Sequence, residues 1–176
     1  MTTSYFPKAV RTYLTDDQKE RIKKEASRRQ STNESLQLKG RNKGPALGEL
    51  ALKYHELGAG GELAVATFLG MEDQVFLDQL PERGSADLPL GIDVKTRGRH
   101  YYDLLVQLDD DPNKTFVLVT VENKEVLMHG WISGTFAMKD QFIKEYVKGR
   151  PCYAIPKAHL SPMLSLKSKV SDASLQ

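Results

Sequence analysis

The sequence predicts an α/β (α+β) domain in which a central mixed β-sheet is flanked by helices. Apolar residues recur every three or four positions in residues 46–69, as on one face of a helix. Residues 91–133 instead hold short segments rich in Val, Ile and Leu, separated by polar turns. A second helical pattern and a last apolar segment follow, and this order of elements is typical of a sheet covered by helices.

The first predicted helix begins after Thr15 and runs to about Gln30. Thr15 can cap the helix, Gln18 stands at the capping-box position, and the two acids between them suit the helix dipole. The helix has almost no apolar face, because Ile22 and Ala26 stand among lysines and arginines. We therefore expect it to be weakly docked or to lie against something acidic.

Residues 31–45 predict a loop, and the long helix of residues 46–69 should end at Gly70. Residues 74–80 predict a short strand, which is followed by a turn at residues 81–85. Three glycines inside the long helix predict either a break or a close contact: Gly58, Gly60 and Gly61.

Four strands are then predicted over residues 91–97, 103–108, 115–122 and 125–133, with Asn123 and Lys124 at the turn between the last two. Residues 135–147 predict a helix and residues 152–156 a final strand. The chain therefore divides into a basic N-terminal helical extension (1–44), a main domain (45–163) and a flexible, Ser- and Lys-rich tail (164–176).

The charge of the chain is unevenly distributed. Residues 1–44 carry 11 Lys/Arg and 5 Asp/Glu, whereas the remainder carries a net charge of −4. A basic segment on a mildly acidic body favours contact with a polyanion, and a solvated charged helix is the equal alternative. One cysteine, Cys152, cannot form an intrachain disulfide, and no apolar run is long enough to span a membrane. We expect a cytoplasmic protein, in the host cytoplasm if it is encoded by a phage.

The segment "SADLPLGIDVKTRGR" carries the most informative chemistry. Side chains alternate along a strand, so Asp93 and Lys95 share one face while Ile92 and Val94 point into the core. A turn at Pro-Leu-Gly can bring Asp87 back beside Asp93. Because Asp93 and Lys95 would face a groove, we expect neither to be needed for packing.

Two adjacent carboxylates repel unless a positive charge lies between them. Mg²⁺, for which Mn²⁺ can substitute, binds one or two protein carboxylates and completes its shell with water and phosphate oxygens. A metal there would polarise a phosphate, and Lys95 would orient a water or stabilise developing charge. The alternative is a solvent-facing hairpin in which Asp93 pairs only with Lys95 or Arg97, and "DVK" by itself does not exclude it.

The order of "GAGGELAVATFLG", Asp87 and "IDVK" resembles the PD-(D/E)xK nuclease superfamily, with a helix-first core like that of the archaeal Holliday-junction resolvases. This resemblance implies a restriction-endonuclease-like core for the domain of residues 45–163. It also implies that Glu62 is the helix acid, that Asp87 and Asp93 bind the metal, and that Lys95 is the catalytic lysine. The carbonyl of Val94 and the carboxylate of Glu62 would complete the metal site.

Residues 53–163 are also similar to a group of small phage and bacterial proteins. The chain departs from the superfamily pattern in two ways: Ala86 stands in the position of the motif's proline, and only five residues separate Asp87 from Asp93. Asp78 is therefore the alternative first aspartate, and Glu49 is the alternative helix acid.

The resemblance implies a Mg²⁺-dependent deoxyribonuclease, an endonuclease, with DNA as its partner; a homodimer is left open. We expect phosphate contacts from basic residues after the motif strand and from the first helix: Arg97, Arg99, His100, Lys23, Lys24 and Arg28. Two alternatives are a catalytically silent DNA-binding or assembly module on the same fold, and a metal-independent enzyme with Lys95 as nucleophile. The two neighbouring acids favour the charged lysine and so oppose the last alternative.

Overall fold

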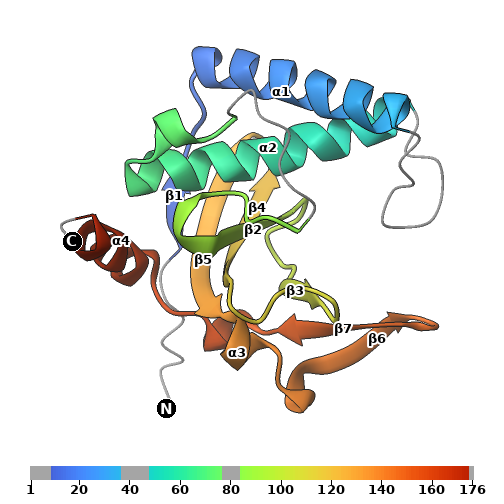
Figure 1. Ribbon diagram of the computed structural model, residues 1–176, viewed down its shortest axis with the longest axis vertical. Coiled ribbons are helices and arrows are strands. Elements are labelled where there is room, and N and C mark those ends of the chain that lie inside the picture. The colour runs from blue at the N-terminus through green and yellow to red at the C-terminus, as the bar shows by residue number, and fades with distance from the viewer. Residues whose placement is uncertain (1–8, 37–47, 77–83, 175–176) are drawn as a thin grey trace.

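A computed structural model describes residues 9–36, 48–76 and 84–174 and shows a mixed α+β fold (Figure 1). The helices of this part are α1 (Asp16–Ser35), α2 (Glu49–Leu69), α3 (Gly134–Ala137) and α4 (Met163–Ala173). The strands are β1 (Val10–Thr12), β2 (Ile92–Arg97), β3 (Leu104–Gln107), β4 (Thr115–Glu122), β5 (Glu125–Ser133), β6 (Ile143–Val147) and β7 (Arg150–Ile155). The predicted fold class is confirmed.

The strands form two sheets. The larger sheet has the order β1-β5-β4-β2, in which β2 runs parallel to β4 and the other pairs are antiparallel. The smaller sheet, β3-β7-β6, is antiparallel throughout. In Figure 1 the two long helices lie together on one side of the larger sheet, and the smaller sheet lies on the other side. One apolar core therefore fills the space between α2 and the larger sheet, and a second lies between the two sheets.

The side chains of strand β2 alternate between the two faces of the sheet, as the sequence predicts. Ile92 and Val94 are buried in the core beneath α2, so Asp93 projects from the opposite face. The preceding turn, Pro89–Gly91, is closed by a bridge between Leu88 and Ile92 that folds the chain back on itself.

Helix α1 begins with the predicted capping box, in which Thr15 and Gln18 each accept a hydrogen bond from the other's backbone N–H. It ends at Ser35, so the first five residues of the predicted loop are helical. Ile22 and Ala26 are buried on the side of α1 that contacts α2, and this small apolar contact docks an otherwise charged helix.

Helix α2 is continuous through its three internal glycines and ends at Gly70 in the left-handed conformation, as predicted. Of the two alternatives expected for these glycines, a break in the helix or a close contact, the structure has the close contact, and it occurs at Gly61. A Cβ placed on Gly61 would lie 1.9 Å from Oγ1 of Thr96 on β2. Gly61 therefore allows the helix to approach the motif strand closely.

The predicted helix at residues 135–147 is wrong. The segment forms the single turn α3, a 3₁₀ turn at Asp140–Phe142 and then strand β6. Phe142 is buried in the core between the sheets, while all five residues of β6 are exposed and pair along the backbone with β7. Pairing with a strand later in the chain therefore overrides the local helical pattern.

The C-terminal residues also differ from the expectation of a frayed tail. Residues Met163–Ala173 form α4, which buries Met163, Leu166 and Val170 in the core beside α2. Of the predicted strand at 74–80, residues 74–76 form no strand, and the remainder, including Asp78, lies outside the described residues. No helix in the described ranges is long and apolar enough to cross a bilayer.

Candidate active site

The four residues expected to be catalytic lie together where β2 begins. Glu62 projects from α2, Asp87 lies before the turn that leads into β2, and Asp93 and Lys95 lie on β2 itself. Asp87 interacts electrostatically with Glu62 and shares a hydrogen bond with Asp93. The Nζ atom of Lys95 lies 3.3 Å from Oδ1 of Asp93. The fold thus joins an acid from a helix, an acid from a turn and an acid–lysine pair from a strand.

Asp93 is held by two lysines. Lys95 approaches Oδ1, and Nζ of Lys114 donates to Oδ2 at 2.9 Å and to the carbonyl of Ser85 at 3.1 Å. Asp93 is only 7% exposed and Lys114 only 8%. A buried carboxylate between two ammonium groups contributes to folding, because removing it would leave buried positive charge unpaired. Asp93 is therefore part of the packing, contrary to the sequence expectation.

Lys95 is fixed by a second acid. Its Nζ lies 2.9 Å from Oδ2 of Asp110, which also accepts the backbone N–H of Gln107 at 2.9 Å. The ammonium group also lies 5.2 Å from the ring centre of Phe116, a distance at which a cation is attracted to an aromatic face. Lys95 therefore sits in a defined position between Asp93 and Asp110.

Asp87 contacts the backbone of the motif strand. Its Oδ2 accepts the N–H of Val94 at 2.7 Å, and β2 lies at an edge of the larger sheet as described. The N–H and C=O of one strand residue point to the same side, so the carbonyl of Val94 also faces this edge, where Asp87 lies.

The two aspartates have opposite pKa shifts. Burial, reinforced by the negative charges of Glu62 and Asp93, raises the pKa of Asp87. Asp87 as a residue is exposed, so solvent moderates the effect of burial, but two nearby negative charges act in the same direction. Burial works against the charge of Asp93, yet Lys95 and Lys114 outweigh it and lower the pKa of Asp93. As the pH falls, these opposite pKa shifts favour protonation of Asp87 before Asp93.

Glu62 is held by α1. Both of its oxygens accept hydrogen bonds from the guanidinium of Arg29, at 2.8 and 2.5 Å, and Arg29 also pairs with Glu25 at 2.7 Å. Burial opposes the charge of Arg29, but its bonds to Glu62 and Glu25 raise its pKa. The acidic surface that the sequence leads us to expect beside the basic helix therefore includes a carboxylate of the protein's own site.

A divalent cation fits part of this set of residues. Asp87 and Asp93 are close enough to share a proton, which a cation could replace, and the Val94 carbonyl faces the same edge. Both oxygens of Glu62 are engaged by Arg29, so Glu62 is not free to join them as arranged. Accordingly, within the described ranges no three His, Cys, Asp or Glu side chains are grouped as a metal site. Both oxygens of Asp93 are also paired, with Lys95 at 3.3 Å and Lys114 at 2.9 Å, so a cation would have to displace one lysine there. The two aspartates and one carbonyl would then suffice for Mg²⁺, which retains several waters.

The residues expected to contact DNA are mostly engaged within the protein. After β2, the guanidinium of Arg97 lies 4.5 Å from the ring centre of Tyr102, and Arg99 pairs with Glu122 at 3.2 Å. His100 contacts Thr120 through Nδ1 at 2.7 Å and Glu125 through Nε2 at 3.1 Å.

On α1, Lys23 pairs with Glu20 at 2.9 Å and Arg28 pairs with Glu25 at 2.8 Å, while Lys24 is exposed. Among the described residues of the N-terminal segment, Lys23 and Arg28 are thus paired with acids of the same helix. A DNA contact by these six residues stays a prediction.

Sequence reasoning missed Arg29, Asp110 and Lys114. None of them belongs to a local motif. Lys114 precedes β4, and only the register of the parallel pair, with Thr115 beside Ile92, brings it to Asp93. Arg29 reaches Glu62 only because α1 docks on α2, a contact between residues 33 positions apart. Comparison with protein-family models, curated proteins and solved structures found no match.

Proposed function

We propose that the protein is a divalent-metal-dependent nuclease that hydrolyses phosphodiester bonds in DNA. The observation that carries this proposal is the set Asp87, Asp93 and Lys95 at the edge of β2: two interacting carboxylates, with an ammonium group 3.3 Å from one of them. The two lysines explain Asp93 as part of the fold, but the Asp87 carboxylate placed against it adds a like charge, which costs stability and is better explained by chemistry than by packing.

The roles follow from the contacts. Asp87, Asp93 and the Val94 carbonyl would hold the cation, which supplies a Lewis acid for a phosphate oxygen when bound. Lys114 keeps Asp93 ionised and oriented through its hydrogen bond at 2.9 Å. Lys95, held between Asp93 and Asp110, would stabilise negative charge developing on the phosphate.

A direct test measures Mg²⁺ binding by calorimetry and cleavage of labelled duplex, single-stranded, flap and four-way DNA. Asp87→Asn and Asp93→Asn should lose both metal binding and cleavage, because each removes a ligand charge. Lys95→Ala should bind Mg²⁺ but not cut, since both ligands remain. Asp109→Asn, an exposed acid in the turn beside Asp110, is the matched control and should behave like the parent. Cleavage that persists in EDTA after bound metal is removed would contradict the proposal.

The second candidate is a catalytically silent DNA-binding or assembly module. One observation favours it: both oxygens of Asp93 are already paired with lysines, and both oxygens of Glu62 with Arg29. A site neutralised by its own cations needs no metal to be stable. Stable binding of the same DNA panel with no cleavage in Mg²⁺ or Mn²⁺, and no effect of Asp87→Asn on that binding, would favour this candidate over the nuclease.

A further inference from the structure

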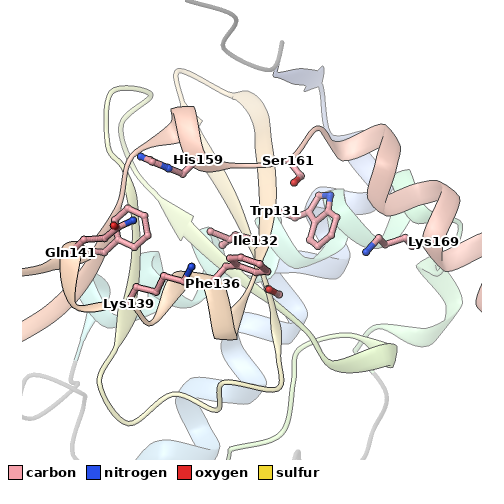
Figure 2. A pocket seen from close by; sticks show the side chains of 10 residues that line it. Trp131, Ile132, Phe136, Lys139, Gln141, His159, Ser161 and Lys169 are labelled. Carbon is pink, nitrogen blue, oxygen red and sulfur yellow. The ribbon is translucent and has the colours of Figure 1, made fainter.

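A pocket of about 440 Å³ lies outside the candidate active site, between the end of β5, α3 and α4 (Figure 2). Trp131 and Phe136 supply aromatic rings, and Lys139, Lys169 and His159 supply basic groups. Figure 2 shows Lys169 beside Trp131 at one end and Lys139 near Phe136 toward the other. The pocket has the volume of a small-ligand site.

The aromatic rings are placed for contact with a ligand. Phe136 is 61% exposed, although a large apolar side chain gains most from burial. The indole Nε1 of Trp131 donates to Oγ of Ser165 at 2.9 Å, and that hydroxyl donates to the Pro162 carbonyl at 2.7 Å. These two bonds fix the orientation of the indole ring. A fixed ring and an exposed ring within one pocket form a surface on which a flat aromatic group can stack.

The charge of the pocket selects an anion. Nζ of Lys139 lies 4.5 Å from the ring centre of Phe136, and Nζ of Lys169 lies 4.6 Å from that of Trp131. Among the residues that the structure describes, no acid lines the pocket and neither lysine lies within 4 Å of a carboxylate. Each ammonium group lies over an aromatic ring and has no carboxylate partner in the described part of the chain, so a phosphate can draw it off the ring and leave that face to a base.

The pocket is connected to the candidate active site through the larger sheet. In the strand register Ile132, which lines the pocket, pairs with Phe116, and Phe116 pairs with Asp93. Two strand spacings correspond to about 10 Å between the backbones of Ile132 and Asp93. The N–H of Gly134, which begins α3, donates to the carbonyl of Lys114 at 2.8 Å, and Lys114 is the residue that holds Asp93.

We propose that this pocket binds one unpaired nucleotide of a DNA strand, with its base against Phe136 and Trp131 and phosphates of the strand against Lys139 at one end and Lys169 at the other. The choice of DNA rests on the proposed function, whereas the nucleotide chemistry rests on the pocket alone. A span of about 10 Å is about three stacked nucleotides, so a strand bound at the candidate active site could reach the pocket; Phe116 is fully buried between the two, so that strand would have to follow the surface. The pocket would thereby direct the activity toward DNA that has an unpaired region.

The test uses the chain's single tryptophan as its probe. A short single-stranded oligonucleotide, added in EDTA so that no cleavage occurs, should quench Trp131 fluorescence, and a blunt duplex should do so more weakly. Phe136→Ala should weaken oligonucleotide binding about 5- to 150-fold, the range for losing one base–aromatic stack. Lys139→Ala and Lys169→Ala should each reduce the slope of log affinity against log salt by about 0.7.

The matched control is Tyr146→Ala, which removes a similarly exposed aromatic side chain from β6, away from the pocket, and should bind like the parent. If Phe136→Ala binds as tightly as Tyr146→Ala, the proposal is overturned. If dAMP binds as tightly as the oligonucleotide, the pocket takes a free nucleotide and the DNA part is overturned. If the protein cleaves DNA in Mg²⁺ but the oligonucleotide does not quench Trp131 fluorescence, the proposal for the pocket is rejected and the proposed nuclease function stands. If the oligonucleotide quenches the fluorescence but no DNA is cleaved, the proposed nuclease function is rejected and the pocket stands.

Discussion

Substituting Gly61 by alanine tests whether the close approach of α2 to β2 sets the geometry of the site. The new Cβ would lie 1.9 Å from Oγ1 of Thr96 and 3.0 Å from its Cβ and Cγ2. Ordinary contacts begin at about 3.5 Å, so helix and strand would have to separate by roughly 1.5 Å. Glu62, the next residue, would move with the helix away from Asp87 and Asp93.

The magnitude follows from two opposing effects. Alanine stabilises a helix interior by about 0.5–1 kcal/mol relative to glycine. Overpacking of this kind costs about 1–3 kcal/mol, and the affected neighbour is a short side chain fixed on a strand. Gly61→Ala should therefore lose about 1–2 kcal/mol of unfolding free energy. For a chain of this size the melting temperature would fall by about 2–8 °C.

Gly60→Ala is the matched control for this substitution. Its Cβ would lie 3.8 Å from Cδ1 of both Ile22 and Leu14, which is ordinary van der Waals contact. It should keep the gain in helix propensity and stabilise the protein by about 0.5–1 kcal/mol. Alanine should thus lower the free energy of unfolding at position 61 and raise it at position 60.

A second substitution separates the steric clash from other causes. The Oγ1 atom of Thr96 is buried without a hydrogen-bond partner among the described residues, so Thr96→Ala removes little that the fold needs. In the Gly61→Ala background it also removes two of the three clashing atoms. The double variant should be more stable than the sum of the single effects by about 0.5–3 kcal/mol.

Urea unfolding and thermal melting of the parent and these four variants provide the measurement, with Mg²⁺ titration by calorimetry as the functional readout. If Gly61→Ala is as stable as Gly60→Ala, the helix does not lie against Thr96 and the reasoning is refuted.

Three further predictions concern other parts of the fold. Burial, and then the charges of Lys157 and His100, lower the pKa of His129 to about 4 from an ordinary value of 6.5, so the unfolded chain binds a proton that the folded chain does not. Stability should therefore fall as the pH drops from about 6.5 to about 4. In thermal melts the variant His129→Gln should show a weaker dependence of melting temperature on pH, whereas substitution of the exposed His159, His159→Gln, should leave the dependence as in the parent. Arg29→Met leaves the carboxylate of Glu62 buried and unpaired, and should lower the free energy of unfolding in denaturant by about 3 kcal/mol. Adding Glu62→Gln to Arg29→Met should recover most of this stability. If no stability is recovered, the Arg29–Glu62 ion pair does not account for the loss. Leu166→Ala should cost about 2–5 kcal/mol, because α4 is packed in the core; an unchanged melting temperature would mean that α4 is not docked.

Several features depend only on neighbours along the chain and could be predicted from the sequence. The capping box at Thr15 and Gln18 was predictable because both partners lie within one helical turn. The side-chain orientations along β2 are local in the same way. Because side chains alternate along a strand, Ile92 and Val94 lie in the core and Asp93 lies on the other face. The turn that returns Asp87 to Asp93 is also local, since only five residues separate them.

Other features depend on residues far apart in the chain and are seen only in the folded protein. Residues 143–147 carry a helical apolar pattern, yet they form β6, because β7 offers backbone partners that no local pattern reveals. The partners of the site acids are equally non-local. Arg29 meets Glu62 across the contact of two helices, and Lys114 meets Asp93 through the register of a parallel strand pair. Motif residues can therefore be identified from spacing, but their charge states cannot, because those are set by ion pairs that form only when the chain is folded.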